Sequence, residues 1–160
     1  EKIEEHPFLQ RIGPDILNPN LTWREVAERL QSKAFSGRAL NSVYLDQAFL
    51  AGLGNYLRSE ILFVAGIHPA KKARELSKGE IGKLARATLH ISQRSYALRG
   101  VTIPDRQYKA LKKKGISYGK ARFFVFSRAN QPCRVCKTKI QRSSANSRRI
   151  YTCAGCQPND

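Results

Sequence analysis

Cys133-Arg134-Val135-Cys136 and Cys153-Ala154-Gly155-Cys156 hold all four cysteines of this chain, and sixteen residues separate the two pairs. One hairpin of that length can bring four thiolates to the corners of a tetrahedron, which is the coordination that Zn²⁺ takes in structural sites. Such a site leaves no ligand position for water. We therefore expect one structural zinc ion that organises the hairpin and takes no part in catalysis.

Two disulfides or a dithiol redox centre are the alternatives for these cysteines. A redox pair is expected beside a βαβ unit, and disulfide-stapled domains are usually shorter secreted chains that carry a signal sequence. The sequence has neither context, and it has no apolar run approaching the roughly twenty residues of a membrane span. We expect a cytoplasmic protein whose thiols stay reduced and available to metal.

The charge of the chain predicts a polyanionic partner. The formal net charge is +17 over 160 residues. From Arg94 onward, sixteen Lys or Arg residues face only Asp105 and Asp160, so the excess forms a contiguous basic half. Solubility alone is a weaker explanation, because solvated surfaces usually mix both signs, and no basic amphipathic helix with a strong apolar face suggests a membrane. Nucleic acid is the favoured partner.

The periodicity of apolar residues predicts a mainly α fold. Capping boxes begin helices at Thr22 and Ser77, which we expect to run over 22–31 and 77–98. Further helices are predicted over 40–47 and from Asn55 to a C-cap at Gly66. The prolines of residues 1–20 indicate a linker entering the domain.

The last third of the chain has a different pattern. Residues 101–120 contain Pro104, a lysine run and two glycines, which predict a mobile basic loop. Residues 123–126 resemble a strand, and 139–143 with 149–152 are the predicted hairpin arms around 144–147. The expected architecture is a helical body with an appended zinc β-hairpin.

The segment 45–56, LDQAFLAGLGNY, is the second informative stretch. Gly52 and Gly54 stand directly before a predicted helix, where glycine lets the backbone approach another group and the free N–H groups of the helix start favour an anion. These glycines could instead only turn the chain between two helices. In a chain this basic, a phosphate site is the favoured interpretation.

These motifs resemble the formamidopyrimidine-DNA glycosylase and endonuclease VIII family, and they resemble its endonuclease VIII branch more closely. Residues 45–69 resemble the helix-two-turns-helix motif of that family, and the four-cysteine hairpin resembles its zinc finger. The amino-acid sequences of residues 6–15 and 95–100 also resemble that branch, and they stand in the same order along the chain. The resemblance predicts a linker over 1–20, a helix-two-turns-helix DNA-binding domain over 21–120 and a zinc finger over 121–160. It weakens over residues 101–120, where this chain is longer.

The resemblance implies a bacterial, nucleoid-associated repair enzyme that acts as a monomer on double-stranded DNA. It would remove oxidised bases, chiefly pyrimidines, and cleave the abasic strand. Gly54 and Asn55 would hold phosphates flanking the lesion, and Arg148 would match the finger arginine, whose planar fork suits phosphate.

Members of this family use an N-terminal proline amine as nucleophile, with a glutamate beside it. This chain starts Glu1-Lys2, and the nitrogen of Pro7 is an amide. We therefore expect the C-terminal DNA-binding half of such an enzyme, with no catalytic residue and no activity of its own, and with its N-terminal catalytic domain as a partner. A stand-alone zinc-ribbon module for DNA or RNA, without enzymatic activity, is the alternative.

Overall fold

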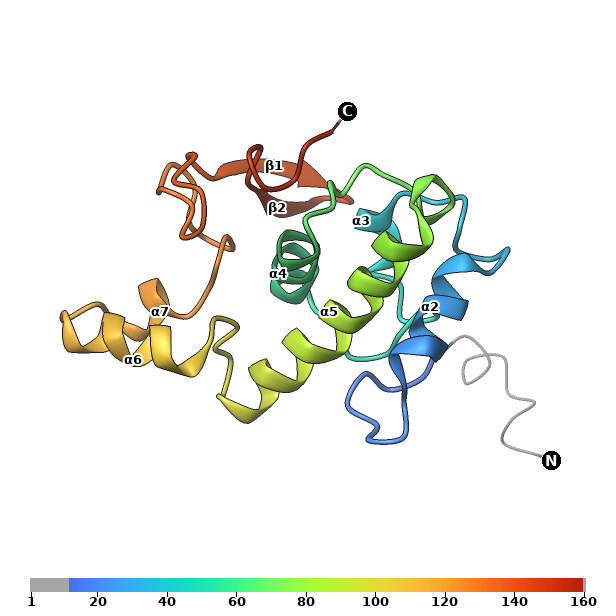
Figure 1. The fold of residues 1–160 in the computed structure, drawn as a ribbon, viewed down its shortest axis with the longest axis horizontal. Helices are drawn as coiled ribbons and strands as arrows, with labels where there is room; N and C mark the ends of the chain where they lie inside the picture. The colour runs from blue at the N-terminus through green and yellow to red at the C-terminus, as the bar shows by residue number, and fades with distance from the viewer. Residues whose placement is uncertain (1–11, 160) are drawn as a thin grey trace.

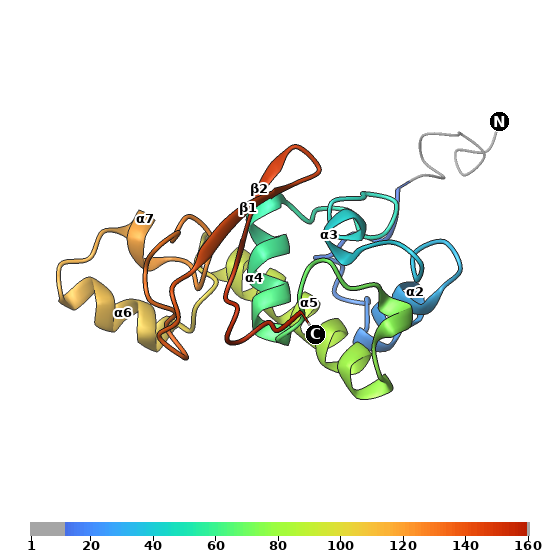
Figure 2. The ribbon, with the colours of Figure 1, turned by 90° about the horizontal axis from the view of Figure 1, so that it is seen from above.

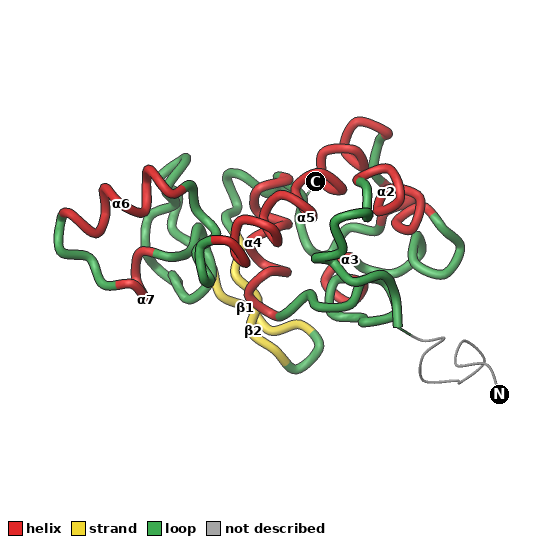
Figure 3. Tube along the Cα trace, turned by 90° about the horizontal axis from the view of Figure 1, so that it is seen from below, coloured by secondary structure: helices red, strands yellow, loops and turns green. Residues whose placement is uncertain are grey.

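A computed structural model describes residues 12–159 and shows a helical body that carries one β-hairpin (Figure 1). Most of the regular secondary structure in the described residues is helical, and the strands β1 and β2 form a single antiparallel sheet (Figure 3). No described helix is both long and apolar enough to cross a bilayer. The elements are α2 (Trp23–Gln31), α3 (Leu40–Val43), α4 (Asn55–Ala65), the 3₁₀ turn η2 (Ala73–Glu75), α5 (Lys78–Ala97), α6 (Asp105–Lys113), α7 (Tyr118–Ala121), β1 (Gln141–Ala145) and β2 (Arg148–Thr152).

The two long helices α4 and α5 occupy the centre of the molecule (Figures 1 and 2). The hairpin packs against α4, α2 packs on α5, and α6 with α7 extends away from the body on the side opposite α2. Residues 1–11 lie outside the described part of the chain. The predicted linker over 1–20 and the segment 6–15 are therefore described only from Ile12 onward. There Gly13 and Ile16 hydrogen-bond to Gln47 and Ala51, and Ile16 is buried. The described end of the predicted linker is therefore packed on the body.

The predicted helix ends are largely confirmed. The Thr22 side chain accepts from the Glu25 N–H at the start of α2, and Ser77 and Glu80 form a complete capping box on α5. Gly66 ends α4 in the left-handed conformation, with φ of 71°. Local side-chain chemistry sets these boundaries, which is why the sequence alone could locate them.

The helix predicted over 40–47 is wrong at its end, because α3 stops at Val43. The Asp46 carboxylate accepts from the Ala48 N–H at 2.9 Å and also from Arg38 Nη1 at 2.8 Å. An aspartate that bonds to the backbone two residues ahead stabilises a turn in place of a helix.

The predicted mobile basic loop over 101–120 is wrong, since the segment contains α6 and α7. Pro104 precedes the first turn of α6. In that turn, Asp105 interacts favourably with the positive end of the helix dipole and pairs with Lys109 Nζ at 3.0 Å. The lysines of the run close the same helix, where positive charge is favourable. Tyr108 and Leu111 pack against a hydrophobic cluster that includes Val101 and Ile103.

Two hydrophobic clusters divide the core, and α4 contributes to both. One cluster joins α2, α3, α4 and α5, with Leu30, Tyr44 and Leu84 fully buried. The other joins Phe63 of α4 to the segment that leads into the hairpin. That second cluster draws residues from both sides of position 120, after which the predicted zinc finger begins.

The strand predicted over 123–126 is also wrong, because this segment turns around the carboxylate of Glu60 on α4. One oxygen of Glu60 accepts from Phe124 N at 2.6 Å, and the other accepts from Val125 N at 2.8 Å and Phe126 N at 3.0 Å. The hydroxyl of Thr102 donates to the first oxygen. Burial raises the pKa of Glu60, and the four donors act in the opposite direction.

Replacing Glu60 by glutamine tests this contact. The amide keeps the shape but loses acceptor capacity, so at least one buried N–H loses its partner. We expect the free energy of unfolding of Glu60→Gln to fall by about 2 kcal/mol or more. Glu28→Gln, an exposed site on α2, should stay within about 0.5 kcal/mol of the unmodified chain. Denaturant unfolding of both variants gives the comparison, and equal stabilities would contradict this role for Glu60.

Candidate nucleic-acid interface and metal centre

The four cysteines come together at the base of the hairpin. Their sulfur atoms all lie within 4.8 Å of one another. The Sγ atoms of Cys133 and Cys156 are 3.8 Å apart, and those of Cys136 and Cys153 are 3.3 Å apart. A disulfide requires about 2.05 Å between sulfurs, so the predicted disulfide alternative does not fit.

This donor set fits a zinc ion. A Zn–S bond of about 2.3 Å places tetrahedral sulfurs about 3.8 Å apart, close to the observed separations. Contacts with Thr138 lower the pKa of the Cys136 thiol to about 6, whereas burial raises the pKa of the Cys153 and Cys156 thiols. A Cβ at Gly155 would lie 2.9 Å from Cys136 Sγ and 2.8 Å from Thr138 Oγ1. The second pair of cysteines can therefore approach the first this closely only with glycine at position 155.

The hairpin itself is confirmed, with arms that differ from the prediction. Ala145 pairs with Arg148, so the turn consists only of Asn146 and Ser147, with φ of 59° and 61°. Asparagine is favoured in this conformation, and two such residues match the twist of a short hairpin. The tip reaches the helical body, where Asn146 Nδ2 donates to Ser42 Oγ at 3.0 Å.

The glycine turn exposes the start of α4. Gly52 has φ of 95°, a conformation that favours glycine, and its N–H donates to Gln47 Oε1 at 2.9 Å. Gly54 is the exposed N-cap and has no side-chain cap. A Cβ on Gly54 would meet no atom within 4 Å, so packing within the described residues does not require glycine here. The open space leaves the first N–H groups of α4 accessible to an anion.

Asn55 bridges the helix start and the hairpin. Its Nδ2 donates to the Arg149 carbonyl at 3.1 Å, and its Oδ1 accepts from Arg58 Nη2 at 2.8 Å. The side chain is half-buried, and one of its two amide hydrogens remains for another acceptor. The contact with Arg149 brings Asn55 beside the strand that begins with Arg148, so the structure places these two predicted site residues together.

Arg58 is a site residue that the sequence analysis missed. The side chain is fully buried under the hairpin, and its Nη1 donates to the Asn41 carbonyl at 3.0 Å and to Asn146 Oδ1 at 3.3 Å. Burial, and secondarily the charge of Arg148, lower the pKa of Arg58 to about 10. Its position three residues after Asn55, on the same helix face, was the signal that could have identified it.

Arg148 is exposed at the first position of β2, and no described acid forms an ion pair with it. The site therefore combines free helix N–H groups, one asparagine amide, a buried guanidinium and an exposed one. None of the groups named here is an acid. This arrangement can hold the phosphates of a polyanion, with charge-assisted hydrogen bonds from Arg148.

Comparison with known proteins was made for the sequence and for the fold. Residues 12–107 match the family described as the formamidopyrimidine-DNA glycosylase H2TH domain. The chain is 46% identical to an Endonuclease 8 of Escherichia coli over 98% of its own length and 56% of that protein. An Endonuclease 8 of Shigella sonnei is 45% identical over the same shares. The chain thus spans a little over half the length of these relatives.

Solved structures show the same fold. The MutM (Fpg) protein of Thermus thermophilus superposes with a TM-score of 0.75 at 30% identity, covering 98% of this chain and 57% of that one. A Lactococcus lactis Fpg in complex with DNA containing an abasic site gives a TM-score of 0.73 at 23% identity, covering 95% of this chain and 54% of that one. The second likeness supports the fold alone.

Removal of the metal provides the test of the cysteine site. Because the strands are short and mostly polar, we expect the ordering of residues 123–156 to depend on zinc. Cys136→Ser, or a strong chelator, should broaden or shift the NMR signals of this segment while those of α2 and α5 persist. Zinc content measured on the same samples should fall from about one ion per chain. An intact hairpin in metal-free protein would contradict the prediction.

Proposed function

Because the chain belongs to the formamidopyrimidine-DNA glycosylase family, we propose that it binds double-stranded DNA through the junction of α4 and the hairpin. The observation that carries this proposal is the hydrogen bond from Asn55, which follows Gly54 at the start of α4, to the carbonyl of Arg149, the neighbour of Arg148, beside the buried Arg58. Gly54 and Asn55 come from the helix start, and Arg148 comes from a strand more than ninety residues later. Two separate anion-binding elements at one place suit a backbone that presents successive phosphates.

Each element would have its own role on the DNA. The N–H groups at the start of α4 and the free amide hydrogen of Asn55 are neutral donors, and they would donate to the oxygens of one phosphate. Arg148 would bind a phosphate with its planar guanidinium. Arg58 would hold Asn55 and the hairpin tip in register, and its buried positive charge would attract the phosphates without touching them.

For the whole protein, we propose a bifunctional base-excision repair glycosylase and AP lyase. The relatives named Endonuclease 8 support this assignment. Likeness to the Endonuclease 8 proteins favours oxidised bases, chiefly pyrimidines. We assign no catalytic residue to this chain. Among the residues that the structure describes, the fully buried acid is Glu60, and four donors occupy it. We propose, as the resemblance to the family implies, that the nucleophile belongs to an N-terminal catalytic domain.

A cavity of about 300 Å³ beside the glycine turn suits this activity. Gly52, Tyr56 and Ser95 are among the residues that line it, and the hydroxyl groups of Tyr56 and Ser95 lie 2.8 Å apart. The Ser92 hydroxyl on the same wall is buried and makes no hydrogen bond. We propose that the extruded nucleotide of the lesion enters on this side, since glycosylases turn the target base out of the duplex.

The remaining assignments follow the same reasoning. We propose that the four cysteines hold one zinc ion, which keeps the hairpin rigid so that Arg148 stays aimed at the DNA. We further propose that the protein works as a monomer on the bacterial nucleoid, and that residues 21–120 and 121–160 are its DNA-binding domain and zinc finger.

The glycine turn can be tested by adding one methyl group. Gly54 has φ of −101°, which any residue adopts, so Gly54→Ala should fold with a stability loss of about 1 kcal/mol or less. Its methyl group would occupy the space left for a phosphate, so we expect affinity for duplex DNA to fall about tenfold or more. Gly79→Ala on α5 is the matched control, because a Cβ at this position would lie 3.9 Å from its nearest neighbour, Ser77 Oγ. Equal DNA affinities of the two variants would refute the role of Gly54.

The two anion-binding elements differ in their response to salt. Arg148→Ala should weaken DNA binding for all sequences and lower the magnitude of the negative slope of log affinity against log salt by about 0.9, because one fewer phosphate counterion is released. Asn55→Ala removes a neutral donor, so it should reduce affinity with little change in slope. Anisotropy titrations of one duplex at several salt concentrations give both values, with exposed Lys78→Ala as the charge control. If Arg148→Ala matches Lys78→Ala while zinc stays bound, Arg148 does not contact DNA.

A further inference from the structure

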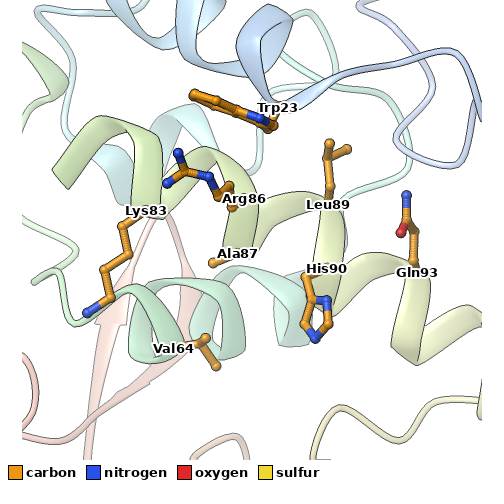
Figure 4. Close-up of a pocket in the computed structure, with 8 residues that line it drawn as sticks. All are labelled: Trp23, Val64, Lys83, Arg86, Ala87, Leu89, His90 and Gln93. Carbon is orange, nitrogen blue, oxygen red and sulfur yellow. The ribbon is translucent and has the colours of Figure 1, made fainter. Parts of the chain in front are cut away.

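A second groove lies on α5, away from the proposed DNA site (Figure 4). It has a volume of about 430 Å³, and residues of α2, α4 and α5 line it. Trp23 comes from α2 and Val64 from α4, while Lys83, Arg86 and His90 come from α5. The proposed DNA-binding function uses none of these side chains.

The apolar part of the groove is preformed. Trp23, Val64 and Leu89 are half-buried and pack against the first hydrophobic cluster, so their exposed sides form a surface supported from below. Ala87, also on the wall, is buried and leaves room between the larger side chains. A rigid apolar surface of this kind can take up an apolar side chain without first rearranging.

The rim of the groove is positively charged. Lys83 and Arg86 carry this charge, and they follow each other at helical spacing, with the exposed His90 one turn further along the same face of α5. The Arg86 guanidinium carbon lies 4.1 Å from the centre of the Trp23 ring, and that of Arg24 lies 4.8 Å from it. Stacking on the ring restrains Arg86, while its N–H donors remain able to bind a carboxylate. No described acid lines the groove or forms an ion pair with Lys83 or Arg86.

The position of the groove argues against a second DNA site. Val64 is nine residues from Asn55 on α4, or about 13.5 Å along the helix axis. The Arg86 guanidinium lies over the Trp23 ring, where a nucleic-acid base would otherwise stack. A second copy of the chain is also a poor occupant, because each copy carries a net charge of +17 and would present the same basic rim.

We propose that this groove binds an acidic segment of a partner protein that carries at least one large apolar side chain. The apolar side chain lies among Trp23, Val64 and Leu89, and flanking carboxylates pair with Arg86 and Lys83. Charge complementarity selects the class of partner, and the apolar contact distinguishes specific docking from general attraction to a basic protein.

The single tryptophan of the chain provides a direct readout, because Trp23 lies in the groove. The probe is a labelled decapeptide of glutamates with a central Leu-Phe pair, titrated into the zinc-loaded chain. One matched peptide replaces the pair by two alanines, and another replaces the glutamates by glutamines. We expect the first peptide to change Trp23 emission on binding, and each matched peptide to bind at least tenfold more weakly.

Charge reversal locates the binding site. Arg86→Glu should weaken the peptide at least tenfold and leave affinity for duplex DNA within twofold of the unmodified chain. Lys112→Glu on α6 makes the same charge change at another exposed position and should alter peptide affinity less than threefold. Thermal unfolding and zinc content confirm that both variants fold.

Three results would overturn the proposal. Unchanged Trp23 emission at saturation would place the peptide elsewhere. Equal losses of affinity in Arg86→Glu and Lys112→Glu, or equal binding of the alanine peptide, would show general attraction to a basic protein. Parallel losses of peptide and DNA affinity in Arg86→Glu would assign this face to nucleic acid instead.

Discussion

The structure depends on one buried carboxylate. Glu60 projects from the middle of α4 and receives the backbone N–H groups of Phe124, Val125 and Phe126 together with the hydroxyl of Thr102. These four donors come from the segments that leave α5 and enter the hairpin. A buried carboxylate is tolerated only when its oxygens are satisfied, so the chain beyond α5 must adopt the turn that supplies them. The hairpin is thereby attached to the helical body.

Arg58 completes this attachment from the same helix. It stands two residues before Glu60, and the two charges do not pair with each other. Glu60 accepts from neutral donors, while the Nη atoms of Arg58 donate to neutral acceptors and its buried Nε makes no hydrogen bond. Glu60 holds the approach to the hairpin, and Arg58 holds its tip through Asn146. Because α4 also begins at the glycine turn, one rigid helix sets the position of the proposed phosphate donors and of Arg148. The cysteines gather at the opposite end of the hairpin, next to Thr152.

Features that follow from local chemistry could be predicted from the sequence. The capping residues Thr22 and Ser77, the C-cap Gly66 and the cysteine spacing act within a few residues or within one hairpin, so their outcome does not depend on the rest of the fold. The failures share a cause as well. The composition of residues 101–120 predicts a loop, but the packing of Tyr108 and Leu111 against a distant hydrophobic cluster supports a helix there.

By itself, the sequence determined the helical body, the hairpin, the gathering of the four cysteines and the glycine turn before α4, because each depends on local geometry and charge. The tertiary structure alone decided that residues 123–126 turn around Glu60, that Arg58 lies beneath the hairpin, and that Asn55 hydrogen-bonds to the strand that Arg148 begins. These contacts join residues 42 to 94 positions apart. Their partners are mostly backbone N–H and C=O groups, which every residue carries and which no sequence pattern can therefore identify in advance.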